Sequence, residues 1–397
     1  MKIVNPFLAT ALFVMVGCIS CKQSDSKNDD LITIDVTKSY PKKELILQDF
    51  MDVEYIPLET NDEFVNQGFV QAVGQDVVIV KNFLNDGNIF IFDRRTGKAI
   101  KKINRRGQGS EEYAHIYRIT LDEDNNEMFV NDVMGQKNVV YDLNGNFKRS
   151  FKYIEGRFNN YMCHFDREHF ICYDSYVSDD GEANEQAFMI ISKQDGSITK
   201  EIQLPFKEKI ITNIIMRDAS GMLWGASPNT HYPIIPYHDS WILVESSSDT
   251  IYNYSPDHTM TPIIVRTPTI QTMDPEVFLF PGAVLTDRYY FMEAVKKEFN
   301  FGANSGYPST KLVYDKQEKS IFEYTLCNDD YSNKKRETME WGPWIPVDNK
   351  TATWLHLEAH RLVEAYEEGK LKGQLEEIAA TLDEESNPVI MLIKHKK

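Results

Sequence analysis

The sequence predicts an all-β fold, a six-bladed β-propeller with a C-terminal helical insertion before its closing strand. Three observations predict it: aromatic residues are abundant, a strand–turn–strand unit recurs at blade-like spacing, and the two chain ends carry strands that suit one shared blade. Phe and Tyr number 22 and 20 in the 397 residues, and both residue types favour strands. A chain of this length is long enough for one large β domain.

The recurring unit is an apolar strand, a polar turn and a second strand. Five such turns occur, at residues 93–97, 142–145, 194–196, 255–257 and 315–317. The steps between Asp93, Asp142, Asp195, Ser255 and Asp315 are 49, 53, 60 and 60 residues. Four short strands in roughly 40–50 residues are typical of a propeller blade. The two longer steps indicate insertions between strands.

Further strands are expected upstream of these turns. The clearest are residues 128–130, 169–171, 222–224, 241–244 and 289–292. A single blade cannot bury both of its faces, so neighbouring blades must stack around an axis.

The sixth blade is expected to form from the two ends of the chain. Residues 53–58 near the start and residues 389–393 near the end are strand-like. Pairing the first and last strands in one blade closes the ring and removes two exposed sheet edges.

A helical segment is predicted over residues 353–384, ahead of a closing strand at 388–394. Apolar residues there step by 4, 3 and 4 positions, and the same steps repeat after Gly369, which predicts a helical hairpin or a kinked helix with one apolar stripe. The apolar positions are Leu355, Ala359, Leu362, Tyr366, Leu371, Leu375, Ile378 and Leu382. We expect this segment to cover part of the propeller, because its many glutamates would repel an anionic membrane surface.

The N-terminus predicts a lipoprotein signal peptide at residues 1–17. Lys2 precedes an apolar run over residues 6–16, and Gly17-Cys18 follows. A basic start, a short apolar stretch and a small residue define a secretory signal, and Met15-Val16-Gly17-Cys18 suits a lipobox, in which the cysteine thiol is acylated. Cys18 is therefore the expected lipidation site, with Cys21 as the alternative. Residues 18–30 are expected to form a polar tether, and residues 31–397 the propeller.

The charge and the cysteines exclude several classes of function. A formal net charge of −17 disfavours nucleic acid, which requires a basic face. Cys163 and Cys172 flank an expected hairpin that turns at residues 167–168, in which they lie directly opposite each other. A disulfide and two buried thiols both remain open for this pair. A metal site with His164 is disfavoured, because strand alternation places Cys163 and His164 on opposite faces. No metal or cofactor is expected.

The segment from Arg105 to Tyr113 leads into two strands with aspartate-bearing turns and resembles an NHL repeat. Its structural motif is Arg106, Gly107, Gly109, Glu112 and Tyr113. With the lipobox, the strand around residues 55–59 and the ending at 387–391, the whole chain resembles the six-bladed β-propeller lipoproteins of Gram-negative bacteria, a family largely without an assigned activity. The resemblance implies a propeller fold and an exported lipoprotein in the outer membrane, in either leaflet. It implies no reaction.

Each group of candidate site residues has two possible interpretations, one functional and one structural. The charged residues of the Arg105–Tyr113 segment can form a polar site at a blade entrance, or the glycines can allow a tight turn while the charges link two blades. The aromatic candidates are His231, Tyr232, Trp241, Trp341 and Trp344. Aromatic side chains with polar tips suit sugars or peptides, and the alternative is that they fill blade interfaces.

The leading functional hypothesis is a membrane-anchored binding or scaffolding module that recognises a glycan, peptide or protein partner on one propeller face. The motifs of a nucleophile elbow, a phosphate loop and a zinc helix are absent from the sequence, so no catalytic residue is predicted. The alternative is a hydrolase or lyase that acts on carbohydrate or peptide at the central channel.

Overall fold

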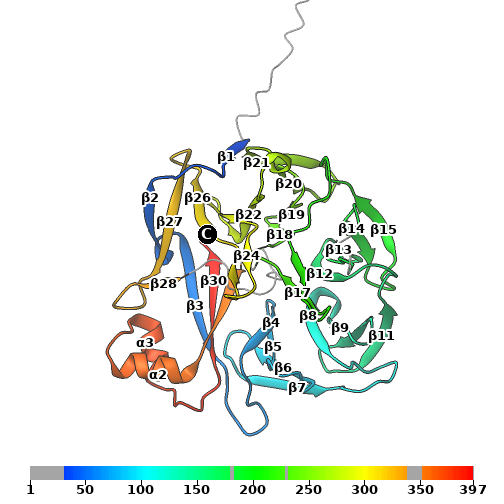
Figure 1. Cartoon of the computed structure of the whole chain (residues 1–397). Coiled ribbons are helices and arrows are strands. Elements are labelled where there is room, and N and C mark those ends of the chain that lie inside the picture. The colour runs from blue at the N-terminus through cyan, green and yellow to red at the C-terminus, as the bar shows by residue number, and fades with distance from the viewer. Residues whose placement is uncertain (1–30, 179–182, 229–230, 338–350, 397) are drawn as a thin grey trace, which may run out of the picture.

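Six β-sheets surround a common axis in the computed structural model (Figure 1), which confirms the predicted six-bladed propeller. The structure describes residues 31–178, 183–228, 231–337 and 351–396. Among these residues, no helix is both long enough and apolar enough to cross a bilayer.

Blades 1 to 3 are four-stranded antiparallel meanders that follow one another along the chain. Blade 1 is β4 (Phe69–Val73), β5 (Val77–Lys81), β6 (Asn88–Asp93) and β7 (Ala99–Asn104). Blade 2 is β8 (Ile116–Asp122), β9 (Glu127–Asp132), β10 (Lys137–Asp142) and β11 (Phe147–Lys152). Blade 3 is β12 (Asn159–His164), β13 (His169–Asp174), β14 (Phe188–Ser192) and β15 (Ile198–Ile202).

Blades 4 and 5 each gain an N-terminal strand that runs parallel to their outer edge. Blade 4 is β18 (Ile234–Tyr237), β19 (Ser240–Leu243), β20 (Thr250–Tyr254) and β21 (Met260–Thr267), with β1 (Ile32–Asp35) beside β21. Blade 5 is β22 (Val277–Leu285), β23 (Tyr289–Lys296), β26 (Ser309–Asp315) and β27 (Ser320–Asn328), joined by β2 (Lys42–Ile46) and β28 (Lys335–Glu337). A short helix, α1 (Leu47–Phe50), leads from β2 to β3. The N-terminal strands cover edges that would otherwise be open to pairing.

The two ends of the chain meet in blade 6. Its described strands are β29 (Thr351–Leu357), β30 (Val389–His395) and β3 (Met51–Pro57), in that order. β3 pairs with β30 from Met51 opposite His395 to Pro57 opposite Val389. The predicted pairing of residues 53–58 with residues 389–393 is therefore confirmed.

The core lies between the blades. The innermost described strands contact one another in the order β4, β8, β12, β18, β22, β29 and back to β4, so the ring is closed. The described residues form six apolar clusters, one at each junction of neighbouring blades. Each blade thus buries both faces against its neighbours, as a closed ring requires.

The ring has two faces of different construction. On the first, which we call the turn face, short turns join the first strand to the second and the third to the fourth in blades 1 to 5; the five predicted turns all lie here. On the second, which we call the loop face, longer segments join the middle strands and cross between blades. Hydrogen bonds link consecutive blades along the turn face. The Glu123 carboxylate in blade 2, for example, accepts the N–H groups of Asp76 and Val77 in blade 1.

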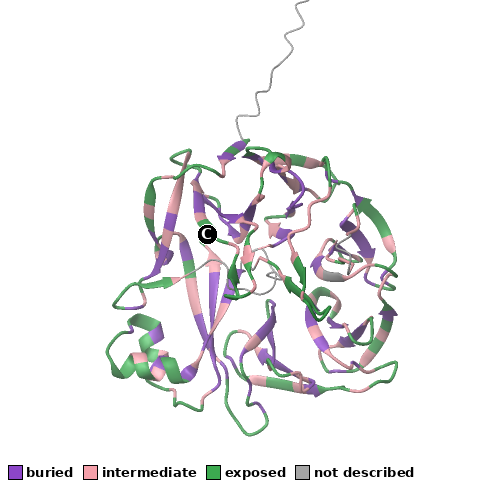
Figure 2. Cartoon of the chain, in the orientation of Figure 1, coloured by how far each residue is buried: buried purple, intermediate pink, exposed green. Residues whose placement is uncertain are grey.

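Two hairpins on the loop face account for the two long steps of the repeat. They are β16 (Ile214–Arg217) with β17 (Leu223–Ala226), and β24 (Phe299–Asn300) with β25 (Ser305–Gly306). Residues 222–224 were expected to contribute a blade strand, but Leu223 and Trp224 belong to β17 outside the blades. The β16–β17 hairpin is exposed near the centre of the ring (Figure 2).

The helical insertion is shorter than predicted. Its helices are α2 (Ala359–Glu367) and α3 (Gly373–Ala379), between β29 and β30, so the predicted start at residue 353 is wrong. Residues 353–357 belong to β29, because they pair with residues 389–393 of β30 in blade 6. Leu362 and Leu375 are buried against Met51 and Tyr55, so the helices cover the edge of blade 6 (Figure 1).

The predicted cysteine register is wrong by one residue. Cys163 pairs with Ile171, and Met162 pairs with Cys172. The turn is longer than expected because the Asp166 carboxylate accepts the N–H groups of Glu168 and His169 and closes a four-residue connection between β12 and β13. Cys163 and Cys172 therefore pack into clusters on opposite faces of blade 3, and both are buried free thiols. This excludes the possible disulfide.

Candidate functional site

The predicted aromatic residues divide between packing and a cavity. Trp241 packs on Phe165 with a ring distance of 4.6 Å, and its indole N–H donates to the carbonyl of His164 at 2.9 Å. Tyr232 is buried in the cluster between blades 4 and 5. Trp241 and Tyr232 therefore fill blade interfaces, which was the alternative interpretation of the aromatic candidates. His231, in contrast, borders a cavity on the loop face. Trp341 and Trp344 lie outside the described residues, as do Cys18 and Cys21.

The Arg105–Tyr113 segment links blade 1 to blade 2. The Tyr113 side chain is fully buried, and its hydroxyl donates to the carbonyl of Gly87 at 2.7 Å and accepts the N–H of Arg105 at 2.9 Å. Burial raises the pKa of Tyr113 to about 12, so it stays a neutral donor.

The glycines of this segment leave room for Glu112. The Glu112 carboxylate accepts the N–H of Gly109 at 2.9 Å. A Cβ at Gly107 would lie only 1.9 Å from that carboxylate, so a larger residue there would displace the Glu112 side chain from this position. Arg106 forms an isolated bridge with Tyr113 through the backbone. All these contacts hold the blade-to-blade crossing together, and none forms an open polar site.

A cavity of about 370 Å³ lies at the inner edges of blades 2, 3 and 4 on the loop face. We call it the channel cavity. Its aromatic lining comes from β8, β12 and β13 and from the loops next to β12, β13 and β18: Tyr117, Phe158, Tyr161, Tyr173, Tyr176 and His231. Its polar lining includes Asp174, Asn184, Lys209, Asn213 and Ser246.

The aromatic wall of the channel cavity is held in fixed orientations. Tyr161 meets Tyr173 edge to face, with ring centroids 6.2 Å apart, and Tyr117 lies 5.7 Å from Phe158. The Arg118 guanidinium lies 4.6 Å from the centre of the Tyr161 ring. The ring of His231 is perpendicular to that of Tyr173 at 5.7 Å. These contacts prearrange ring faces around a concave space.

Asp174 organises the polar wall. Its Oδ1 accepts the N–H groups of Phe158 at 2.8 Å and Tyr176 at 3.0 Å. Its Oδ2 accepts the side-chain amide of Asn184 at 2.7 Å, and the Arg157 guanidinium lies 3.7 Å away. The carboxylate thus positions two aromatic residues and one amide of the lining, and its own oxygens are occupied.

The other ionisable groups of the cavity are also engaged. Lys209 Nζ lies 2.9 Å from the buried carboxylate of Glu245, which also accepts the hydroxyl of Ser247 at 2.8 Å. Burial lowers the pKa of His231, so its ring is neutral near pH 7. The lining is therefore rich in rings and carries little free charge.

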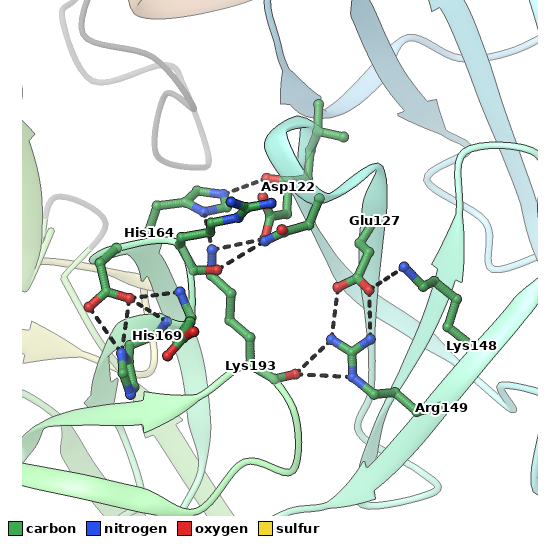
Figure 3. Close-up of polar contacts among 12 residues, drawn as sticks. Asp122, Glu127, Lys148, Arg149, His164, His169 and Lys193 are labelled. Carbon is green, nitrogen blue, oxygen red and sulfur yellow. Dashed lines mark hydrogen bonds and ion pairs between the residues drawn. The ribbon is translucent and has the colours of Figure 1, made fainter.

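A second cavity, of about 600 Å³, lies on the turn face between blades 2 and 3. Lys193 Nζ donates to Asp122 at 2.8 Å and to Nδ1 of His164 at 3.1 Å (Figure 3). The Nε2–H of His164 donates to the carbonyl of Leu121 at 2.5 Å. Burial, reinforced by the charge of Lys193, lowers the pKa of His164. Burial alone would raise the pKa of Asp122, but the hydrogen bonds from Lys193 and Asn125 outweigh it and lower that pKa.

The same region contains a second ionic contact. Arg149 binds the Glu127 carboxylate through two hydrogen bonds of 2.6 and 2.7 Å and also donates to the carbonyl of Lys193 (Figure 3). These pairs join the turns of blades 2 and 3. Since Lys193, His164 and Asp122 satisfy one another, this cluster joins blades, and the channel cavity is the better candidate for a ligand.

Sequence reasoning missed most of the channel cavity. Tyr117, Tyr161 and Tyr173 lie on different strands and meet only when the ring closes. One local signal was present, the run Tyr173-Asp174-Ser175-Tyr176, which places an acid and two aromatics at the end of a strand. Among the described residues, no group of three or more His, Cys, Asp or Glu side chains is placed to hold a metal ion.

Comparisons with known proteins agree with the fold. A family model described as a 6-bladed beta-propeller matches residues 22–349. No protein of curated function matches the chain significantly.

Three of the solved structures that match the chain are the following. A Bacteroides fragilis protein, provisionally described as exported, superposes with a TM-score of 0.58 at 13% identity, over 92% of this chain and 100% of that one. A DUF4221-family member from Bacteroides vulgatus gives a TM-score of 0.41 at 11% identity, over 88% and 98% of the two chains. An inactive variant of virginiamycin B lyase from Staphylococcus aureus gives 0.33 at 14% identity, over 69% and 88%.

Proposed function

The chain belongs to this six-bladed β-propeller family, and on that premise we propose that it is an exported, lipid-anchored module that binds a neutral oligosaccharide in the channel cavity. The observation that carries the proposal is the ring-lined wall of this cavity. Aromatic faces stack on the apolar faces of sugars, and nearby polar groups hydrogen-bond their hydroxyls. A volume of about 370 Å³ is within the range of ligand pockets.

The charges of the cavity favour an uncharged ligand. Lys209 is paired with Glu245, so it offers little attraction to an anionic sugar. The formal net charge of −17 adds repulsion to any anion that approaches. Asn184 and Asn213, in contrast, supply neutral amide groups that suit hydroxyls.

Binding is also favoured over turnover. A hydrolase or lyase at the central channel needs a general acid or base that can reach its substrate. Asp174 is held by two backbone N–H groups and by Asn184, and Lys209 by Glu245. The ionisable groups that line the cavity therefore serve to position its wall.

Tyr176 provides the sharpest test of this site. We expect Tyr176→Ala to weaken binding of a neutral oligosaccharide, selected from a glycan array and measured by titration calorimetry, by about tenfold or more, as for an aromatic residue that contributes strongly to binding. Tyr366→Ala is the matched control, since Tyr176 and Tyr366 are 43% and 41% exposed and Tyr366 lies on α2, away from the cavity lining. If no neutral oligosaccharide bound, or if both variants bound as the wild type does, the proposal would be refuted.

The proposed anchor is a lipid on Cys18 in the outer membrane. It rests on the lipobox-like run of residues 15–18. We expect Cys18→Ala to release the protein from the outer-membrane fraction and to remove the lipid from its mass spectrum, whereas Cys21→Ala leaves both unchanged. The opposite result would assign the lipid to Cys21, and retention of the lipid in both single variants would contradict the proposal.

A further inference from the structure

The β16–β17 hairpin displays an apolar surface that the blades leave uncovered. Its exposed apolar side chains are Ile215, Met216, Met222, Leu223 and Trp224. Met216 lies directly opposite Trp224 on one face of the ribbon, while Ile215 and Leu223 alternate onto the other. Single exposed apolar residues are ordinary on a protein surface, but five on one short ribbon are unusual, and groups of exposed apolar residues often mark binding sites.

The hairpin is held at its base and ordered at its tip. The Tyr307 hydroxyl from blade 5 lies 2.9 Å from the carbonyls of both Thr212 and Ala226, one on each side of the hairpin. At the tip, Asp218 accepts the N–H of Met222 at 3.0 Å and the indole N–H of Trp224 at 2.8 Å. A two-stranded ribbon alone is marginally stable in water, so these contacts keep the apolar side chains in place.

The base of the β16–β17 hairpin borders the channel cavity. Thr212 and Asn213, which lead into β16, and Ser227 and Pro228, which follow β17, all line that cavity. A ligand seated among the aromatic rings therefore reaches the hairpin with any substituent that leaves the cavity on this side.

We propose that the ligand of the channel cavity is amphiphilic: its saccharide occupies the cavity, and an alkyl or acyl chain attached to the saccharide lies along the β16–β17 hairpin. This inference rests on the proposed function and names its ligand class, a neutral saccharide with an apolar chain. The hairpin contributes contact area of the kind that binds hydrocarbon, and the cavity contributes the stacking surfaces and hydrogen bonds that select the sugar.

A bilayer surface is a poorer occupant for the same hairpin. Asp218 sits at its tip, and hydrogen bonds from Ser220 and Trp224 hold the pKa of this carboxyl at about 2. The charged carboxylate at the hairpin tip opposes insertion of the tip into the hydrocarbon of a bilayer. A single alkyl chain that lies along the strands does not require this carboxylate to leave water.

The test compares free sugars with their alkyl glycosides. The probes are maltose, lactose and cellobiose and the octyl glycoside of each, titrated calorimetrically into the propeller from residue 31 below the critical micelle concentrations. For a disaccharide that binds, we expect its octyl glycoside to bind the wild type at least about tenfold tighter, the gain given by about two buried methylene groups. The double variant Met216→Ser/Trp224→Ser should lose this gain and keep the affinity for the free sugar.

A matched control separates this effect from a general loss of apolar surface. Met134 is exposed on the loop face, in the turn between β9 and β10, and Met134→Ser should leave both affinities unchanged. Equal affinity for sugar and octyl glycoside in the wild type, or a gain that survives in the double variant, would overturn the inference while the saccharide site stands. Octyl glycosides that bind through the hairpin when no free sugar binds would instead overturn the proposed function, and this inference with it.

A vesicle assay tests whether the hairpin binds a membrane surface instead of an alkyl chain of the ligand. Neutral phosphatidylcholine vesicles without saccharide should not cosediment the wild-type propeller. Cosedimentation that the double variant abolishes would assign the hairpin to a membrane surface and overturn the inference.

Discussion

The same strands end at both faces of the propeller, but the two faces differ in the connections between strands and in the side chains that they expose. On the turn face, aspartate carboxylates close the short turns: Asp93 accepts the N–H groups of Arg95 and Thr96, and Asp142 those of Asn144 and Asn146. On the loop face, the connections are longer and include two extra hairpins. The turn face is constrained by local backbone chemistry, whereas the loop face is free to vary in length.

Exposed apolar residues follow the same division. Of the exposed large apolar side chains among the described residues, all but Leu31 and Ile100 belong to loop-face segments. The loop-face members are Val65, Phe83, Leu84, Met134, Tyr176, Ile215, Met216, Met222, Leu223, Trp224 and Tyr366. Buried charged groups on the turn face are paired with one another in places, as in the pair of Lys193 and Asp122. We infer that the turn face serves stability and the loop face serves binding.

The largest expected effect comes from breaking the buried ion pair of the turn face. Lys193→Met leaves the Asp122 carboxylate buried without its partner, and removal of one member of such a pair costs about 3–5 kcal/mol. The control is Lys148→Met, because Lys148 also binds a carboxylate, that of Glu127, but is 39% exposed, and exposed pairs contribute about 0–1 kcal/mol. Urea unfolding measures both. If the two variants lost the same free energy of unfolding, the buried Lys193–Asp122 pair would contribute no more to stability than the exposed pair.

Two tryptophans give the next contrast. Trp241 is 7% exposed and fills the interface of blades 3 and 4, while Trp224 is 49% exposed on the loop-face hairpin. Trp241→Ala should lower the free energy of unfolding by about 3–5 kcal/mol, and Trp224→Ala by about 0.5 kcal/mol or less. A large loss from Trp224→Ala in urea unfolding would mean that the hairpin supports the fold, and would remove the reason to assign it to a ligand.

The contrast between the faces also explains what the sequence could predict. The turns at Asp93, Asp142 and Asp315 were visible because each depends on a local carboxylate that binds the next backbone N–H groups. Ring closure was visible because the strands at both ends, which include Ile56 and Ile390, are strongly apolar. These features can be predicted from neighbouring residues or from a simple hydrophobic pattern.

Other features depend on contacts that a local pattern cannot show. The one-residue error at Cys163 and Cys172 arose because the Asp166 carboxylate lengthens its turn. The helical spacing through Leu355 also fits a strand, and pairing with Met391 decides the outcome. The aromatic wall of the cavity joins Tyr117 in blade 2 to Tyr161 in blade 3, so it exists only in the closed ring.

A moderate effect is expected from pH. Burial lowers the pKa of His164 on the turn face, where Lys193, Asp122 and Asp124 surround it. Below the unfolded value of about 6.5, the unfolded chain takes up a proton that the folded chain refuses, so stability falls as pH falls through this region. The slope is at most about 1.4 kcal/mol per pH unit for one such group. His164→Gln, which keeps a donor and an acceptor, should make the urea-unfolding profile between pH 5 and 6.5 flatter than that of the wild type.

The smallest effect on stability should accompany the largest effect on binding. Tyr176 is exposed on the loop face, so Tyr176→Ala should change the free energy of unfolding by about 0.5 kcal/mol or less while it weakens saccharide binding by about tenfold or more. Lys193→Met should do the reverse, because Lys193 lies outside the lining of the channel cavity. Urea unfolding and calorimetric titration of the same two proteins, under conditions where both are folded, separate the two roles. Loss of saccharide binding in folded Lys193→Met protein would show that the two faces are coupled, and the division of stability and binding between them would then be wrong.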